Sequence, residues 1–193
     1  LQLGIAKDAQ VIGFVGSFAP WHGLDLLVEA FSRLQAEFPQ AHLLLVGQAN
    51  PQWQKLLDRL RSPALAGQVT LAGFVRPAEI PGYLAVMDIT TLPNTAYYCS
   101  PLKLFEYMAM ARPTVSVATA PVTATLQDGV EGLLFPENQV DALTSALRRL
   151  LADPALRIRL GLAARLRIER EYTWQHNAQQ VFTLLAQAYE VWR

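Results

Sequence analysis

Short apolar segments that alternate with helical segments constrain the fold of this chain more than any other feature of its sequence. Most of these apolar segments run without a polar interruption, which is typical of strands that are covered on both faces of a sheet. The sequence predicts six such strands, at Val11–Gly16, His42–Gly47, Val69–Phe74, Met87–Pro93, Thr114–Ala118 and Gly132–Phe135.

Helical segments separate these strands. The first of them repeats apolar residues at helical spacing from Leu24 and stops before Pro39. Because strands joined by helical crossovers are parallel, the sequence predicts an α/β fold with a Rossmann-like open parallel sheet of about six strands and helices on both faces. These helices are expected at Leu24–Phe38, Trp53–Leu60, Pro77–Leu84 and Leu102–Ala111, and a loop is expected over 118–125.

Only helices are predicted after the sixth strand. Asp153 has the character of an N-cap, and Pro154 is placed to begin a helix. The tail helices are expected at Val140–Ala152, Pro154–Arg170 and Trp174–Trp192. We therefore expect one domain over residues 1–193, divided into a linker remnant (1–9), an α/β core (10–136) and a helical tail (137–193).

Composition excludes several classes of partner and compartment. Sixteen basic residues balance sixteen acidic ones, so no overall charge recruits nucleic acid, and no nucleic-acid partner is expected. The single cysteine, Cys99, cannot form an intrachain disulfide, and no apolar run reaches the roughly 20 residues that span a bilayer. A cytoplasmic location is therefore expected. The first residue is not Met, so we expect an N-terminal part to be missing.

Familiar nucleotide and metal motifs are absent from the sequence. It has no G-x-G-x-x-G fingerprint, no P-loop and no Asp-x-Asp pair that would hold a metal against a diphosphate. We therefore expect no metal site and no cofactor, so that any nucleotide would bind without a metal from this chain.

The segment from Tyr97 to Arg112 is the most informative for function. Glu106 lies within an otherwise apolar helix, where a buried carboxylate needs a partner. One interpretation pairs it with Lys103, one turn earlier. The interpretation we favour has Glu106 accept hydrogen bonds from two ribose hydroxyls, while N–H groups at the start of the helix bind a phosphate.

Several segments together resemble one known domain. They are VIGFVGSFAPWHGLDLLVEAF, HLLLVG, VTLAGFV, SPLKLFEYMAMARPTVSV, DGVEGLLF and ADPALRIRLGLAARLRI. This combination is similar to the C-terminal, donor-binding domain of the GT-B-fold retaining glycosyltransferases of group 1. The resemblance implies that a nucleotide-sugar is the donor substrate, that the missing N-terminal domain binds the acceptor and carries the catalytic residues, and that the isolated chain is inactive.

The resemblance also implies a donor-binding site. Glu106 matches the second residue of the family's Glu-x7-Glu pattern, which binds the ribose, and the first falls on Tyr98. Ser100 and Lys103 would share the diphosphate. Val75 and Arg76 would meet the base, although a plain surface arginine explains Arg76 equally well. The remaining expected donor-binding residues are Gly16, Ser17, His22, Gly47, Cys99 and Leu102.

Besides Tyr98, the sequence departs from the family pattern at three further places. Ser17 and His22 stand where the family carries basic residues, and Pro121–Ala124 replaces a Gly-Gly-x-x-Glu segment. His22 would add positive charge only when protonated, so we expect nucleotide-sugar affinity to rise as the pH falls from about 8 towards 6. A catalytic thiol at Cys99 is disfavoured, because the sequence offers no complete set of partners for it.

Two alternatives to a transferase remain open. Whether the full-length protein associates with a membrane is also open. The chain could be a nucleotide-sugar-binding module without turnover, or a nucleotide-sugar epimerase of related architecture. Five arginines crowd the penultimate helix, where peripheral membrane association of the full-length protein competes with the favoured interpretation of a solvated face. They are Arg157, Arg159, Arg165, Arg167 and Arg170.

Overall fold

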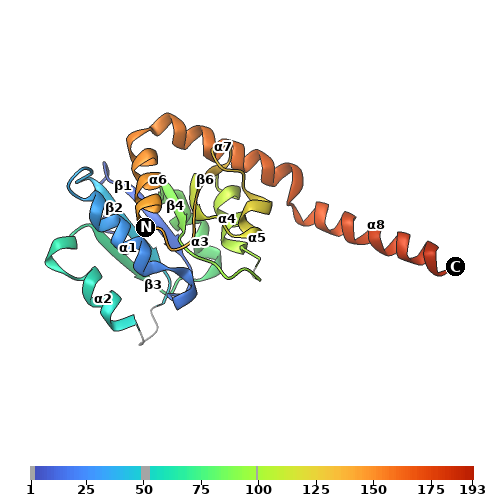
Figure 1. Cartoon of the computed structure of the whole chain (residues 1–193), viewed down its shortest axis with the longest axis horizontal. Helices are drawn as coiled ribbons and strands as arrows, with labels where there is room; N and C mark the ends of the chain where they lie inside the picture. The colour runs from blue at the N-terminus through green and yellow to red at the C-terminus, as the bar shows by residue number, and fades with distance from the viewer. Residues whose placement is uncertain (1–2, 49–52, 99) are drawn as a thin grey trace.

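The core of the molecule is one parallel sheet. The computed structural model describes residues 3–48, 53–98 and 100–193, and within these ranges the chain forms a six-stranded sheet in the order β3-β2-β1-β4-β5-β6 (Figure 1). Every pairing between neighbouring strands in it is parallel, as predicted. The strands are β1 (Gln10–Val15), β2 (Ala41–Val46), β3 (Val69–Gly73), β4 (Ile89–Leu92), β5 (Thr114–Val117) and β6 (Gly132–Phe135).

Both faces of this sheet are buried, which explains why its strands are apolar without interruption. In β1, Ile12 and Phe14 belong to one hydrophobic cluster, whereas Val11 and Val15 belong to a second one. Successive side chains of a strand point to opposite faces, so both faces need apolar residues. The register places Phe14 opposite Leu45 of β2, and both side chains lie in the first cluster.

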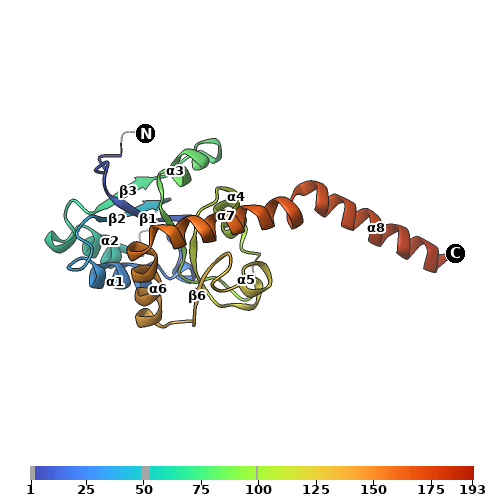
Figure 2. The ribbon, with the colours of Figure 1, turned by 90° about the horizontal axis from the view of Figure 1, so that it is seen from above.

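Helices cover the two faces (Figures 1 and 2). The first cluster includes side chains from α1 (Leu24–Leu34), α2 (Gln54–Leu60) and α6 (Val140–Ala152). The opposite face is covered by α3 (Ile80–Val86), α4 (Leu102–Ala109) and α5 (Ala120–Thr125). Helix α7 (Pro154–Glu171) begins against the first cluster and ends against α4, so it crosses one edge of the sheet.

Short helical turns also occur in the connections. They are the 3₁₀ turns at Pro20–His22, Pro63–Leu65 and Pro77–Glu79.

The expected loop over 118–125 is wrong. Residues 120–125 form α5, with Thr119 extended at the N-cap and a proline in the first turn. Pro121 favours this start because its φ suits a helix and the N–H it lacks would have no partner there. The prediction of Asp153 as an N-cap is confirmed, since its carboxylate accepts a hydrogen bond of 2.9 Å from the Leu156 N–H.

The last helix, α8 (Trp174–Trp192), projects away from the rest of the molecule (Figures 1 and 2). Thr173 caps its start by accepting a hydrogen bond from the His176 N–H. The described side chains of α8 are all exposed, and many are large and apolar. The exposed large ones are Trp174, Val181, Phe182, Leu184, Leu185, Tyr189 and Trp192.

Candidate functional site

Two glycines let the carboxyl ends of β1 and β2 approach each other closely. Gly16 and Gly47 have φ values of 148° and 145°, which L side chains rarely adopt. A Cβ on Gly47 would clash with the Gly16 carbonyl oxygen, and a Cβ on Gly16 would clash with Cε of Lys103. Because Gly16 has no side chain, the side chain of Lys103 can lie across the end of β1.

Lys103 is in hydrogen-bond contact with His22. The Nζ atom of Lys103 lies 3.0 Å from Nε2 of His22, and Nδ1 of His22 lies 2.6 Å from the carbonyl oxygen of Ser17. A carbonyl oxygen can only accept, so Nδ1 carries the proton and Nε2 of the neutral ring accepts from the lysine ammonium. The structure thus brings five of the expected residues together at the carboxyl ends of β1 and β2: Gly16, Ser17, His22, Gly47 and Lys103.

The environment of His22 differs from the one we expected. Burial of the ring, and next the positive charge of Lys103, lower the pKa of His22 below its ordinary value of 6.5, although the hydrogen bond to Ser17 opposes the shift. The neutral imidazole is therefore the favoured form. The expectation of a protonated His22 that itself supplies charge does not fit this geometry.

Glu106 lies on α4, one turn beyond Lys103, and its side chain reaches solvent. Partial burial raises the pKa of Glu106 above its ordinary value, and the charge of Lys103 opposes that shift. Among the described residues Glu106 forms no salt bridge, so the alternative interpretation, an ion pair with Lys103, is replaced by a longer-range attraction. The carboxylate is consequently available to a ligand.

A buried tyrosine fixes α4 against β1, and the sequence analysis missed it. The Tyr107 hydroxyl accepts a hydrogen bond from the Val15 N–H at 2.9 Å and lies 3.3 Å from the Val15 carbonyl oxygen. Burial raises the pKa of Tyr107 far above its ordinary value, so the hydroxyl stays protonated and donates to that carbonyl. The signal available in the sequence was a tyrosine hydroxyl on an otherwise apolar helix face, where a buried polar group needs a hydrogen-bond partner.

Thr119 is a second residue that the sequence analysis missed. It lies at the carboxyl end of β5, where α5 begins, and its hydroxyl is buried without a hydrogen-bond partner among residues 3–48, 53–98 and 100–193. Its position before the helix-starting Pro121 was the signal that could have identified it as an N-cap.

Of the other expected donor-binding residues, Tyr98, Ser100 and Leu102 lie in the segment that leads into α4 and at its first residue. Tyr97 and Tyr98 are 80% and 76% exposed, and their rings meet edge to face with centroids 5.1 Å apart. Ser100 and Leu102 are exposed as well, whereas Cys99 lies outside the described residues.

Val75 and Arg76 follow β3, whose carboxyl end adjoins that of β2. Val75 packs partly against the second cluster, and Arg76 is exposed and pairs with Glu79 at 3.1 Å. This pair joins the start of the 3₁₀ turn to its last residue. The local role explains why an arginine precedes Pro77, and the exposed guanidinium is still accessible to a ligand.

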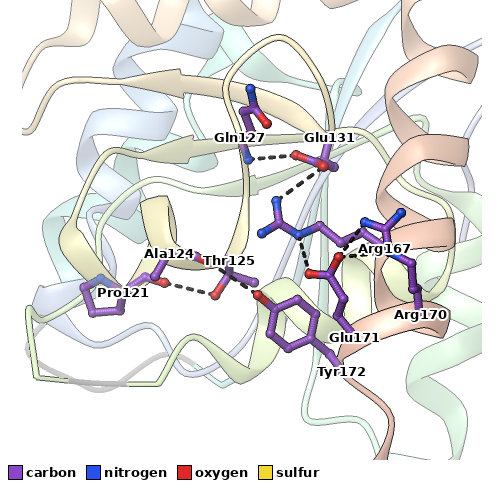
Figure 3. Close-up of polar contacts among 9 residues, drawn as sticks. All are labelled: Pro121, Ala124, Thr125, Gln127, Glu131, Arg167, Arg170, Glu171 and Tyr172. Atoms are coloured by element: carbon purple, nitrogen blue, oxygen red, sulfur yellow. Dashed lines mark hydrogen bonds and ion pairs between the residues drawn. The ribbon is translucent and has the colours of Figure 1, made fainter. Parts of the chain in front are cut away.

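A polar cluster fastens α5 and the segment before β6 to the end of α7 (Figure 3). Arg167 forms ion pairs of 3.3 Å with Glu131, which is buried, and with Glu171. Glu131 also accepts a hydrogen bond of 2.8 Å from the Gln127 N–H, and the Tyr172 hydroxyl donates to the Ala124 carbonyl oxygen at 3.4 Å. The segment that replaces the family's Gly-Gly-x-x-Glu is therefore anchored to the helical tail.

The arginines of α7 all have partners within the domain. Arg157 and Arg159 donate to the carbonyl oxygens of Leu150 and Gly129, and Arg165 pairs with Glu169 at 2.7 Å. Arg167 and Arg170 both pair with Glu171, so each of the five arginines has a contact within the described chain.

Membrane-spanning helices and metal-binding clusters are both absent from residues 3–48, 53–98 and 100–193. None of the helices in these ranges is both long and apolar enough to cross a membrane. Nor does any group of three or more His, Cys, Asp or Glu side chains in the described part of the chain have the arrangement of a metal site.

Solved structures share this fold. Sucrose-phosphate synthase from Thermosynechococcus elongatus superposes with a TM-score of 0.85 at 28% identity, over 98% of this chain and 48% of that one. Anabaena HepE in complex with UDP superposes with a TM-score of 0.84 at 24% identity, over 96% of this chain and 50% of that one.

Sequence relatives identify the family. The D-inositol 3-phosphate glycosyltransferase of Kineococcus radiotolerans is 32% identical over 97% of this chain and 46% of its own length. The phosphatidyl-myo-inositol mannosyltransferase of Mycolicibacterium smegmatis is 28% identical over 92% of this chain and 45% of its own length. This chain thus spans about half the length of the curated relatives it matches. Residues 9–153 match the family model for glycosyl transferases group 1, and the chain belongs to that family.

Proposed function

We propose that this chain is the donor-binding half of a retaining, metal-independent glycosyltransferase that transfers a sugar from a nucleotide-sugar. The observation that carries the proposal is the placement of Lys103 over Gly16, with the carboxylate of Glu106 one helical turn away. A cation and a carboxylate at this spacing match the two polar parts of a nucleoside diphosphate, its phosphates and its ribose.

Lys103 and Ser100 would bind the diphosphate together with backbone N–H groups. A lysine ammonium neutralises phosphate as a compact charge, and the exposed Ser100 hydroxyl can donate to a phosphate oxygen. Gly16, Ser17 and Gly47 would let the diphosphate approach the backbone closely. These groups together supply charge stabilisation without a metal from this chain.

The ends of the donor would bind on either side of the diphosphate. Glu106 would accept hydrogen bonds from the ribose hydroxyls, and the segment at Val75 and Arg76 would meet the base. The sugar would lie near Tyr98 and Leu102. Anabaena HepE, which shares this fold, was solved in complex with UDP, and this agrees with a nucleoside diphosphate as part of the proposed donor.

A second domain would complete the enzyme by binding the acceptor and carrying the catalytic residues. The relatives are about twice as long as this chain, and α8 exposes a set of large apolar side chains that nothing in the described chain covers. Apolar patches of this kind mark interaction sites. We propose that α8 packs against that second domain, that residues 10–136 hold the donor, that residues 137–193 form the connecting helical tail, and that the enzyme works in the cytoplasm.

A nucleotide-sugar-binding module without turnover is the second candidate. It is favoured by the exposed Tyr98 ring at the position where the family carries its first glutamate. Binding of UDP-glucose and GDP-mannose to the 193-residue chain, measured by calorimetry, tests the donor site. Transfer by the full-length protein then separates an enzyme from the module, and epimerised sugar without an acceptor would instead reveal an epimerase.

A further inference from the structure

His22 is built into the site in a way that its sequence position does not predict. Its ring contacts those of Phe14 and Trp21, with centroids 5.5 and 5.9 Å away, and the residue is only 7% exposed. Both ring nitrogens have partners: Nδ1 contacts the carbonyl oxygen of Ser17, and Nε2 contacts Nζ of Lys103. Direct contact with a diphosphate would require the ring to leave this position.

The end of the Lys103 side chain contacts the same part of the structure. Its stem lies over Gly16, its Nζ atom is 6.0 Å from the centroid of the Phe14 ring, and that atom reaches Nε2 of His22. A lysine side chain otherwise samples many rotamers, and fixing it costs conformational entropy. The histidine acceptor reduces that cost before any ligand arrives.

We propose that His22 is a positioning residue for the donor diphosphate: its neutral imidazole accepts a hydrogen bond from Lys103 and holds the ammonium at the end of β1, where the phosphates bind. This inference rests on the proposed function. The family's basic residue at position 22 is thus replaced by a pair, in which α4 supplies the charge and the loop after β1 supplies its support.

The contact between His22 and Lys103 determines whether the affinity for a nucleotide-sugar rises or falls with pH. The groups that face the His22 ring are the Ser17 carbonyl, the Lys103 ammonium and the rings of Phe14 and Trp21, and the next charged group on α4 is Glu106. An imidazolium cannot accept from an ammonium and repels it, so protonation of His22 would displace Lys103. Affinity for a nucleotide-sugar would then fall in acid, whereas a direct cationic role would make it rise.

Two substitutions distinguish the contact of Nε2 with Lys103 from the contact of Nδ1 with Ser17. His22→Gln can place an amide oxygen near the position of Nε2 and still accept from Lys103. His22→Asn can keep a donor for the Ser17 carbonyl but has no atom at that distance. We expect His22→Gln to bind UDP-glucose or GDP-mannose within about threefold of the wild type, and His22→Asn to bind about 10- to 100-fold more weakly.

A double-mutant cycle with Lys103→Met shows whether His22 acts through the lysine. In that background we expect His22→Asn to change affinity by less than about twofold. Additive losses, or affinity that rises as the pH falls from 7 to 5.5, would overturn the inference while leaving the proposed function intact. His176→Gln, on the exposed helix α8, is the matched control and should match the wild type.

A measurement without ligand keeps the inference testable if a variant fails to fold. Nitrogen-15 NMR of the wild-type imidazole should show a protonated Nδ1 and an unprotonated Nε2. Lys103→Met should raise the pKa of His22, because the lysine charge lowers it. The opposite tautomer, or a pKa that ignores Lys103, would refute the pair. If the wild type binds neither probe, the proposed function fails, and the positioning role fails with it.

Discussion

The hydroxyl of Tyr107 lies 2.9 Å from the backbone nitrogen of Val15 and so joins α4 to the last residue of β1. The pairing of β1 with β4 involves only Ile12 and Gly13, so the chain beyond them has no strand partner on that side. There the Tyr107 hydroxyl contacts the N–H and the carbonyl oxygen of Val15 instead. Because Lys103 and Glu106 lie on the same helix, this contact sets their position relative to Gly16.

Tyr107→Phe should weaken both the fold and the site. The substitution removes a buried hydroxyl that serves both polar groups of the Val15 backbone, so we expect the free energy of unfolding to fall by about 1–3 kcal/mol. Denaturant titration measures this loss, with Tyr83→Phe on α3 as the control. If the two variants unfold at the same denaturant concentration, the anchoring role of Tyr107 is wrong.

Glu106→Gln should weaken nucleotide-sugar binding without destabilising the domain. The substitution replaces two charge-assisted hydrogen bonds by at most one neutral bond, so we expect a loss of about 1.5–3 kcal/mol, or roughly 10- to 150-fold in affinity. Calorimetry with UDP-glucose and GDP-mannose measures it, and Glu169→Gln on α7 is the matched control. Unchanged affinity would exclude Glu106 from the ribose site.

Chelation should leave binding unchanged. The proposed diphosphate site consists of Lys103, Ser100 and backbone N–H groups, so EDTA has nothing to remove. The experiment compares affinities in EDTA and in magnesium. A loss of affinity in EDTA that magnesium restores would show that a metal takes part.

Folding stability should decrease in mild acid through two histidines. Burial lowers the pKa of His22 and of His42 below the ordinary 6.5, so the folded state binds fewer protons than the unfolded chain. Their contribution is complete above about pH 6.5 and is lost as the pH falls below that value. Denaturant titration at pH 7, 6 and 5.5 should show this slope, and the variant with both His22→Gln and His42→Gln should have a smaller one. Equal slopes would contradict the burial of neutral rings.

Removal of α8 should leave the domain intact. Its described side chains are exposed, so a chain that ends at Thr173 loses almost no buried apolar surface. We expect the free energy of unfolding to change by less than about 0.5 kcal/mol. A large loss of stability on truncation would mean that α8 packs on this domain instead of a second one.

The sequence pattern predicted the architecture well because parallel strands and amphipathic helices leave strong periodic signals. The tail helix after Asp153 was predictable from its cap and proline. Helix α5 was not, because six residues rich in threonine, alanine and proline give no clear helical period.

The site was predictable only in part. Glu106 was recognisable from its charge in an otherwise apolar helix, and Lys103 from the resemblance of the surrounding segment to the family. The contact between His22 and Lys103 joins residues 81 positions apart, and the state of the imidazole depends on burial that only the folded chain provides. The same holds for Tyr107, whose partner Val15 lies 92 positions away.

Whether this chain binds a sugar donor through Lys103 is decided by the affinities of the wild-type chain and of Lys103→Met for UDP-glucose and GDP-mannose, measured by calorimetry. Lys55→Met, on the exposed surface of α2, is the matched control. We expect the wild type and the control to bind at least one of the two donors and Lys103→Met to bind it at least about tenfold more weakly. Equal affinity of all three proteins, or no binding by any of them, would contradict this expectation.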